Sequence, residues 1–172
     1  IRDLVATMVQ KAHARGLKVV MYQTGLELTS TPDRNPYPEH PDWPQRSLDG
    51  QPILFNDISS SQEHWLDKGQ WDLWVSPCSS YRQFSLSRVQ EMVRTGIDGL
   101  WVDTVYLQHS IGHHDDLWPS TDPCSIAAFH AATGLSVPTA ENWDSPTWRR
   151  WIVWRHWQMT EYLLAVKETA RQ

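Results

Sequence analysis

Apolar side chains at the start of the chain follow first a helical and then a strand-like pattern. The first segment places them at the spacing of one helix face: Leu4, Val5, Met8, Val9 and Ala12. We expect this helix to stop at Gly16, and a continuous apolar run over residues 17–22 follows directly. A helix, a glycine and then an apolar run is typical of a parallel strand covered on both faces.

Two further apolar runs, over residues 71–76 and 97–102, predict a second and a third strand. A helix is predicted between them over about residues 85–94, and Gly96 ends it. The stretch 23–69, rich in Pro, Asp and Ser, separates the first two strands and is predicted to be a long loop.

The last third of the sequence is predicted to be a loop followed by two helices. The loop covers residues 103–121, and a short helix around residues 124–133 ends at Gly134. Ser145 followed by Pro146 is a strong helix start, because serine caps free N–H groups and proline tolerates the first position. A long helix is therefore expected from there to the end of the sequence.

This order of elements indicates an α/β fold with a parallel sheet. A complete (β/α)₈ TIM barrel typically needs ~250 residues. Three strands in 172 residues are therefore expected to be roughly strands 2 to 4 of a partial (β/α)₈ TIM barrel with long βα loops. We expect residues 1–172 to be a single incomplete barrel domain, since the sequence begins and ends inside predicted helices.

Composition excludes several classes of partner. A net charge of -5 with scattered Lys and Arg disfavours nucleic-acid binding, and no apolar run is long enough for a membrane span. The N-terminal residues show no targeting signal. Cys78 and Cys124 can form at most one bridge, and no C-x-x-C pair indicates zinc. Neutral or small polar substrates fit this composition better, and we expect no cofactor.

Eleven tryptophans stand out, because a flat indole face suits the C–H face of a sugar. One group is expected mostly to pack helices: Trp65, Trp148, Trp151, Trp154 and Trp157. A second group, at strand ends or in loops, gives the candidate sugar platforms: Trp43, Trp74, Trp101 and Trp118.

Asp103 follows the third strand directly and is the candidate catalytic carboxylate. The carboxyl ends of barrel strands form the active-site face, and a carboxylate after an apolar strand is costly unless it is paired or has a task. Glycoside hydrolysis uses two carboxylates, of which Asp103 could be the nucleophile. The alternative is an aspartate that only caps the loop. Asp98, at the other end of the same strand, is interpreted as structural.

Other polar residues near strand ends are candidate substrate ligands. They comprise Tyr22 and Glu27 at the first strand, Tyr81 and Arg82 after the second, and His109, His113 and His114 in the loop after the third. The three histidines with Asp115 also suggest a metal. Their irregular spacing disfavours it, so no metal ligand is assigned.

Five segments taken in order resemble a known group of proteins. They read HPDWPQRSLDGQP, SPCSSYR, GIDGLWVDT, PCSIAAFHAATGLSVP and SPTWRRWIVWR. The set, over about residues 1–165, resembles the hypothetical glycosyl hydrolases, distantly similar to α-fucosidase-like and amylase-like enzymes. The resemblance implies a (β/α)₈ barrel acting on glycosidic bonds, with Asp103 at the position of the nucleophile.

Three functions follow as hypotheses. The first is a glycoside hydrolase that hydrolyses O-glycosidic bonds, with Asp103 as nucleophile and the acid/base residue outside this sequence, so that these residues alone would be inactive. The second is a non-catalytic carbohydrate-binding barrel in which Asp103 only accepts a hydroxyl hydrogen bond. The third is a metal-dependent hydrolase of another substrate that uses the histidine loop.

Overall fold

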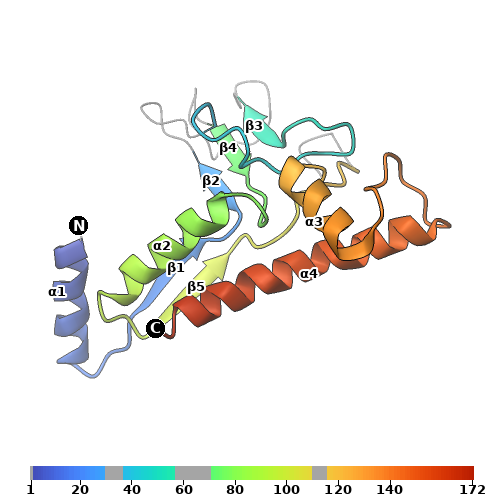
Figure 1. The fold of residues 1–172 in the computed structure, drawn as a ribbon. Helices are drawn as coiled ribbons and strands as arrows, with labels where there is room; N and C mark the ends of the chain where they lie inside the picture. Colours follow the sequence, from blue (N-terminus) through green and yellow to red (C-terminus); the bar gives the residue numbers. More distant parts are fainter. Residues whose placement is uncertain (1, 30–36, 57–70, 110–115) are drawn as a thin grey trace.

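The computed structural model describes residues 2–29, 37–56, 71–109 and 116–172 (Figure 1). Its elements follow one another as α1 (Arg2–His13), β1 (Val20–Thr24), β2 (Glu27–Thr29), β3 (Leu54–Asn56), β4 (Trp71–Trp74), α2 (Tyr81–Val93), β5 (Gly99–Asp103), α3 (Pro123–Thr133) and α4 (Pro146–Thr169).

These strands form two small sheets. In the first, β1 and β5 run parallel, in a register that pairs Val20 with Gly99 and Thr24 with Asp103. In the second, β4 lies between β2 and β3 and is antiparallel to both. Helix α2 connects the second sheet to β5, so the whole of β2, β3 and β4 lies in the connection between two parallel neighbours.

The prediction of a partial (β/α)₈ barrel with strands 2 to 4 is wrong. Within the described ranges there is one parallel pair and no barrel, because the predicted middle strand, residues 71–76, does not join the parallel sheet. Its first four residues form β4, which pairs with β2 and β3 from the stretch predicted to be a loop. Both are three-residue strands, too short to give a clear alternating pattern. The apolar run of β4 was therefore assigned to the wrong sheet.

Helices α2 and α4 pack together against the parallel pair and the start of the second sheet (Figure 1). The buried residues of this core are Leu26, Trp43, Leu73, Val75, Tyr81, Val89, Tyr162 and Val166. A polar chain crosses it: Gln23 donates to Ser85 Oγ at 3.1 Å, and Ser85 Oγ lies 2.7 Å from Tyr162 Oη. Tyr162 in turn donates to the Gly25 carbonyl at 3.1 Å, which fixes α4 against the end of β1.

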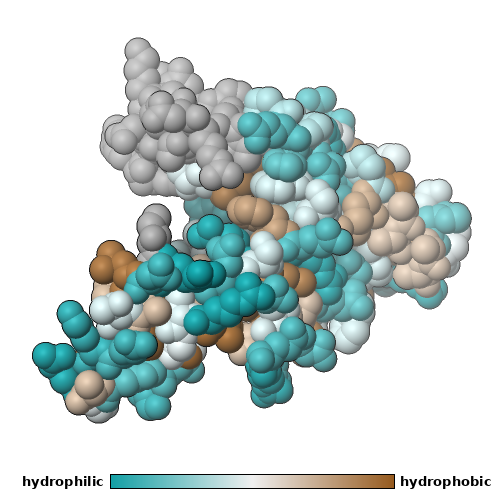
Figure 2. Space-filling view, turned by 60° about the vertical axis from the view of Figure 1, so that its left-hand side comes forward, coloured by the Kyte–Doolittle hydropathy of each residue, from teal (hydrophilic) through white to brown (hydrophobic). Residues whose placement is uncertain are grey.

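The opposite face of the parallel pair is open in the described part of the chain. Figure 2 shows apolar side chains at the molecular surface as brown patches. Large apolar side chains exposed on this sheet face are Val20, Tyr22 and Trp101, and the paired register places Asp103 on the same face. The carboxyl end of β5 is therefore accessible.

A second apolar cluster gathers the tryptophans of α4. Trp148, Trp151 and Trp154 are buried there with Phe129 of α3. For these three tryptophans the interpretation as helix packing is confirmed, whereas Trp157 is 53% exposed. Trp65 lies outside the described residues.

Two local features stabilise the fold, a disulfide and the hydrogen bonds of Asp98. Cys78 and Cys124 form the single bridge that the sequence allows and join the turn before α2 to the start of α3. Asp98 is structural as interpreted, since its carboxylate accepts from the Val19 amide and from Lys18, each at 2.8 Å. Lys18, the Val19 amide and His13, in that order, hold the pKa of Asp98 far below its usual range.

The helices of the described residues were compared with the length and hydropathy that a membrane span needs. None of them meets both requirements.

Candidate functional site

Asp103 is held at the end of β5 by two donors. Tyr22 Oη donates to Asp103 Oδ2 at 3.1 Å, and the amide of Thr104 donates to Asp103 Oδ1 at 2.8 Å. Thr104 has a φ of 53°, a left-handed conformation that a β-branched residue rarely adopts. The backbone therefore turns sharply directly after the candidate nucleophile, and the strain lies at the site.

Gly25 allows the strand ends to approach closely. Its amide donates to the Asp103 carbonyl at 2.7 Å. A Cβ atom on Gly25 would lie 2.5 Å from Val105 Cγ2 and 2.8 Å from the Asp103 carbonyl oxygen. Only glycine fits here without moving the segment that carries Asp103.

We expect Gly25→Ala to displace that segment, lowering the free energy of unfolding by roughly 1–3 kcal/mol and reducing the turnover of any substrate hydrolysed. Chemical denaturation and steady-state kinetics measure the two effects. Gly99→Ala is the matched control, because a Cβ on Gly99 meets Val20 Cγ2 at an ordinary 3.6 Å. Equal stability of the two variants would contradict the close-approach argument.

Two further carboxyl groups, Glu27 and Asp72, lie on neighbouring strands. The β2–β4 register pairs Thr29 with Asp72 and Glu27 with Trp74, so Glu27 and Asp72 are diagonal neighbours on one face. Asp72 is fully buried, while Glu27 is half-buried. Burial first, and then the charge of Glu27, raise the pKa of Asp72 to about 7.

The charges of Glu27 and Asp103 act on two tyrosines, Tyr22 and Tyr106, and that of Asp72 acts on Tyr106. Burial and the charges of Glu27, Asp72 and Asp103 raise the pKa of Tyr106. Desolvation, the hydrogen bond to Asp103, and the charges of Asp103 and Glu27 raise the pKa of Tyr22. The ends of β1, β2, β4 and β5 therefore converge on one acidic region.

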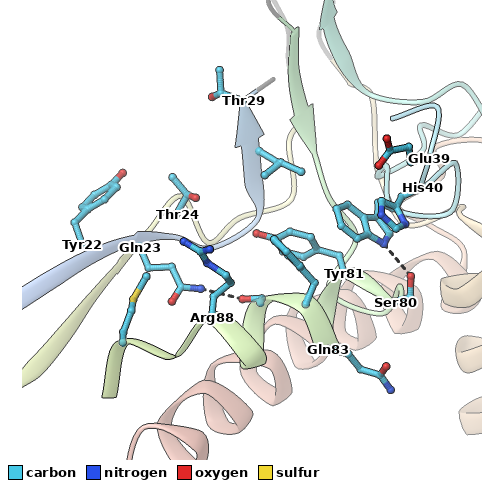
Figure 3. A pocket seen from close by; sticks show the side chains of 15 residues that line it. Tyr22, Gln23, Thr24, Thr29, Glu39, His40, Ser80, Tyr81, Gln83 and Arg88 are labelled. Atoms are coloured by element: carbon cyan, nitrogen blue, oxygen red, sulfur yellow. Dashed lines mark hydrogen bonds between the residues drawn. The ribbon is translucent and has the colours of Figure 1, made fainter. Parts of the chain in front are cut away.

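A cleft of about 790 Å³ opens beside this region, between β1, β2, α2 and residues 39–43 (Figure 3). Polar side chains from several elements line it, among them Thr24, Thr29, His40, Gln83 and Arg88. Tyr22 belongs both to this lining and to the hydrogen bond with Asp103. The cleft is therefore connected to the candidate nucleophile through Tyr22.

Trp43 and Tyr81, two predicted substrate ligands, lie in the wall of the cleft. Both are buried, and the rings of His40 and Trp43 are stacked with their centroids 3.8 Å apart. Trp43 Nε1 donates to Ser80 Oγ at 2.8 Å. One indole face is thus covered by His40.

The remaining predicted ligands are spread over the molecule. Trp101 lies on the open face two residues before Asp103, whereas Trp118 packs against Trp148 in the second cluster, with ring centroids 5.1 Å apart. Arg82 is in α2 instead of the predicted loop and donates to the Glu161 carbonyl of α4 at 3.3 Å.

The histidine loop is only partly described. His109 is exposed, and its carbonyl accepts from Leu117 at 2.9 Å. His113 and His114 lie outside the described residues. Within the described ranges, no group of three or more His, Cys, Asp or Glu side chains is arranged to hold a metal ion.

The sequence analysis missed Asp72, although the sequence contains a signal for it. Asp72 interrupts the apolar run WDLWV, and a carboxylate inside a buried strand needs a proton, a partner or a task. Tyr106 was missed as well, and no pattern in the sequence points to it. Only the turn after β5 brings it close to Trp74, with ring centroids 4.6 Å apart.

A model of a known protein family matches part of the chain. The family described as hypothetical glycosyl hydrolase 6 matches residues 1–104, which include Tyr22, Glu27, Asp72 and Asp103. No curated protein and no solved structure matches the chain significantly. The match covers more than half of the sequence and agrees with the resemblance noted in its motifs, so the chain belongs to the hypothetical glycosyl hydrolase 6 family.

Proposed function

We propose that this chain hydrolyses O-glycosidic bonds, with Asp103 as the nucleophile. The observation that carries the proposal is the position of Asp103: at the carboxyl end of a parallel strand, on an open sheet face, bound by Tyr22 next to a cleft. The family description supports the reaction class. A carbohydrate is the proposed substrate, and the proposed reaction needs no cofactor.

The proposed roles follow from the contacts. The carboxylate of Asp103 attacks the anomeric carbon and forms a glycosyl ester, which water then hydrolyses. Tyr22 Oη, the donor to Asp103 Oδ2, fixes the direction in which the carboxylate points. The exposed rings of Tyr22 and Trp101 lie side by side in the register and offer apolar faces to a sugar.

Other substrate contacts are proposed with different support. Tyr81 and Trp43 line the cleft, and Glu27 lies near Tyr22. For Arg82, His109, His113, His114 and Trp118 the role in substrate binding stays a prediction from the sequence.

A covalent trap tests the nucleophile. We would treat the complete protein with a panel of 2-deoxy-2-fluoro glycosides that have good leaving groups. Fluorine slows both formation and hydrolysis of the glycosyl ester, and the good leaving group restores the rate of formation, so the ester accumulates. The expected result is one sugar bound to the peptide that contains Asp103, identified by mass spectrometry, together with loss of hydrolysis. A label on another carboxyl group, or turnover of the panel without any label, would reject Asp103 as nucleophile.

A further inference from the structure

We infer that Glu27 gives the proton to the leaving oxygen in this reaction, and that Asp72 is the buried carboxyl group that keeps a proton on the pair. The inference rests on the proposed function. It places the partner of Asp103 within the described residues, whereas the sequence analysis expected that partner outside the chain.

Backbone contacts connect the start of β2 to the segment that carries the nucleophile. Glu27 comes two residues after Gly25, whose amide donates to the Asp103 carbonyl at 2.7 Å. Between them, the amide of Leu26 donates to the Thr104 carbonyl at 3.1 Å. The start of β2 therefore lies next to the end of β5. Glu27 is half-buried, so part of its side chain is open to a substrate and part is shielded from water.

Asp72 is the member of the pair that cannot reach solvent. Thr29 Oγ1 donates to Asp72 Oδ1 at 3.2 Å, whereas no group in the described part of the chain donates to the buried Oδ2 atom, and the carboxyl group of Glu27 lies within hydrogen-bond reach of Asp72. A buried carboxylate oxygen without a donor is costly. A proton shared with Glu27 would supply the missing donor.

The electrostatics agree with this geometry. Burial and the neighbouring charge of Glu27 raise the pKa of Asp72 to about 7, so the pair holds one proton well above the pH at which an ordinary carboxyl group loses it. Pairs whose environment separates the two proton affinities provide the acid in many hydrolases. Asp72 does not touch substrate and is a positioning residue.

The two steps balance in atoms and charge. As Asp103 bonds to the anomeric carbon, the bond from that carbon to the leaving oxygen breaks and the proton of Glu27 moves to this oxygen. Asp103 is then a neutral ester and Glu27 a carboxylate. In the second step water adds to the anomeric carbon, the ester bond breaks, and a proton of that water returns to Glu27.

Glu27→Gln tests the proton donor by its dependence on the leaving group. For the sugar that the complete wild-type protein hydrolyses, alkyl glycosides need a proton on the leaving oxygen, whereas dinitrophenyl glycosides do not. We expect the kcat of the alkyl glycoside to fall by about 10²–10⁴-fold. Formation of the glycosyl ester from the dinitrophenyl glycoside, seen as the burst of dinitrophenolate, should stay near the wild-type rate.

Asp72→Asn tests the positioning role through pH. The amide that replaces the Asp72 carboxyl group cannot hold the proton of the pair, so the basic limb of kcat/KM should move to lower pH. Thr29→Val is the matched control. It removes only the hydroxyl group that lowers the pKa of Asp72, so the same limb should move to higher pH or stay. A purely structural Asp72 would change stability and leave the limb in place.

The outcomes separate the two proposals. Glu27→Gln could lower the rates for both glycosides equally, or lower neither rate, while Asp103→Asn is inactive. In that case Glu27 is not the proton donor, and Asp103 remains the nucleophile. If the label and the activity do not depend on Asp103, the proposed function fails. A basic limb that is the same in wild type and in Asp72→Asn would overturn the role of Asp72.

Discussion

Asp103→Asn should lower kcat on the order of 10⁴-fold, as expected when a single member of a catalytic unit is removed, while sugar binding persists. The amide is nearly the same size, and its one oxygen still accepts from either Tyr22 or the Thr104 amide, so the fold and the cleft remain. It is not a competent nucleophile, so the glycosyl ester does not form. Steady-state kinetics measure the loss of activity, and calorimetric titration with the unhydrolysed sugar measures binding.

Asp98→Asn is the matched control for this experiment, because it makes the same chemical change next to the strand that carries Asp103. Asp98 lies just before β5, at the end away from the site, and binds Lys18 and the Val19 amide. Its replacement should affect stability and leave kcat unchanged. If Asp103→Asn kept near-wild-type activity, Asp103 would not be the nucleophile. If the wild-type protein bound sugar without hydrolysing any glycoside, the result would favour the hypothesis of a non-catalytic carbohydrate-binding protein.

Trp148→Ala should lower the free energy of unfolding by about 3–5 kcal/mol. The side chain is fully buried, and its ring lies near those of Trp118, Trp143 and Trp151, with centroid distances of 5.1, 6.0 and 5.2 Å. Truncation would leave a cavity among rigid rings that cannot collapse into it. Denaturant unfolding followed by circular dichroism measures the change.

Trp157→Ala is the control on the same helix, since this side chain is 53% exposed. It should change stability by less than about 0.5 kcal/mol. A loss in Trp157→Ala as large as that in Trp148→Ala would mean that a surface of α4 is covered in the native protein. In that case the burial described here would not explain the stability of the helix.

The sequence predicted the helices well because their signals are local. Gly16, Gly96 and Gly134 each follow a predicted helix and have positive φ angles, and Ser145 accepts from the amide of Trp148 as a capping residue. Helix α2 begins at Tyr81, four residues before the predicted start, so Tyr81 and Arg82 belong to its first turn. The parallel strands at β1 and β5 were also predicted.

The sheet to which β4 belongs could not be predicted, because strand pairing is a long-range property. The apolar run of β4 is compatible with a parallel or an antiparallel partner, and β2 and β3 are too short to stand out in a polar stretch. The candidate site likewise has one part that local sequence predicts and another that depends on long-range contacts. Asp103 was found from its place after a strand. The pairing of β2 with β4 brings Glu27 and Asp72 together, and the bonds of Gly25 and Leu26 to residues 103 and 104 join this sheet to the end of β5.

The backbone hydrogen bonds of Leu26 affect how much conformational entropy the site would lose when a substrate binds. Its amide is bound to Thr104 and its carbonyl accepts from Val75, so one residue is fixed to both the segment after β5 and the segment after β4. Glu27 is the next residue, and the proposed acid and nucleophile are thus attached to one hydrogen-bonded backbone junction. The conformational entropy of bringing them together is lost during folding and not during binding. A sugar would then find the two groups preorganised.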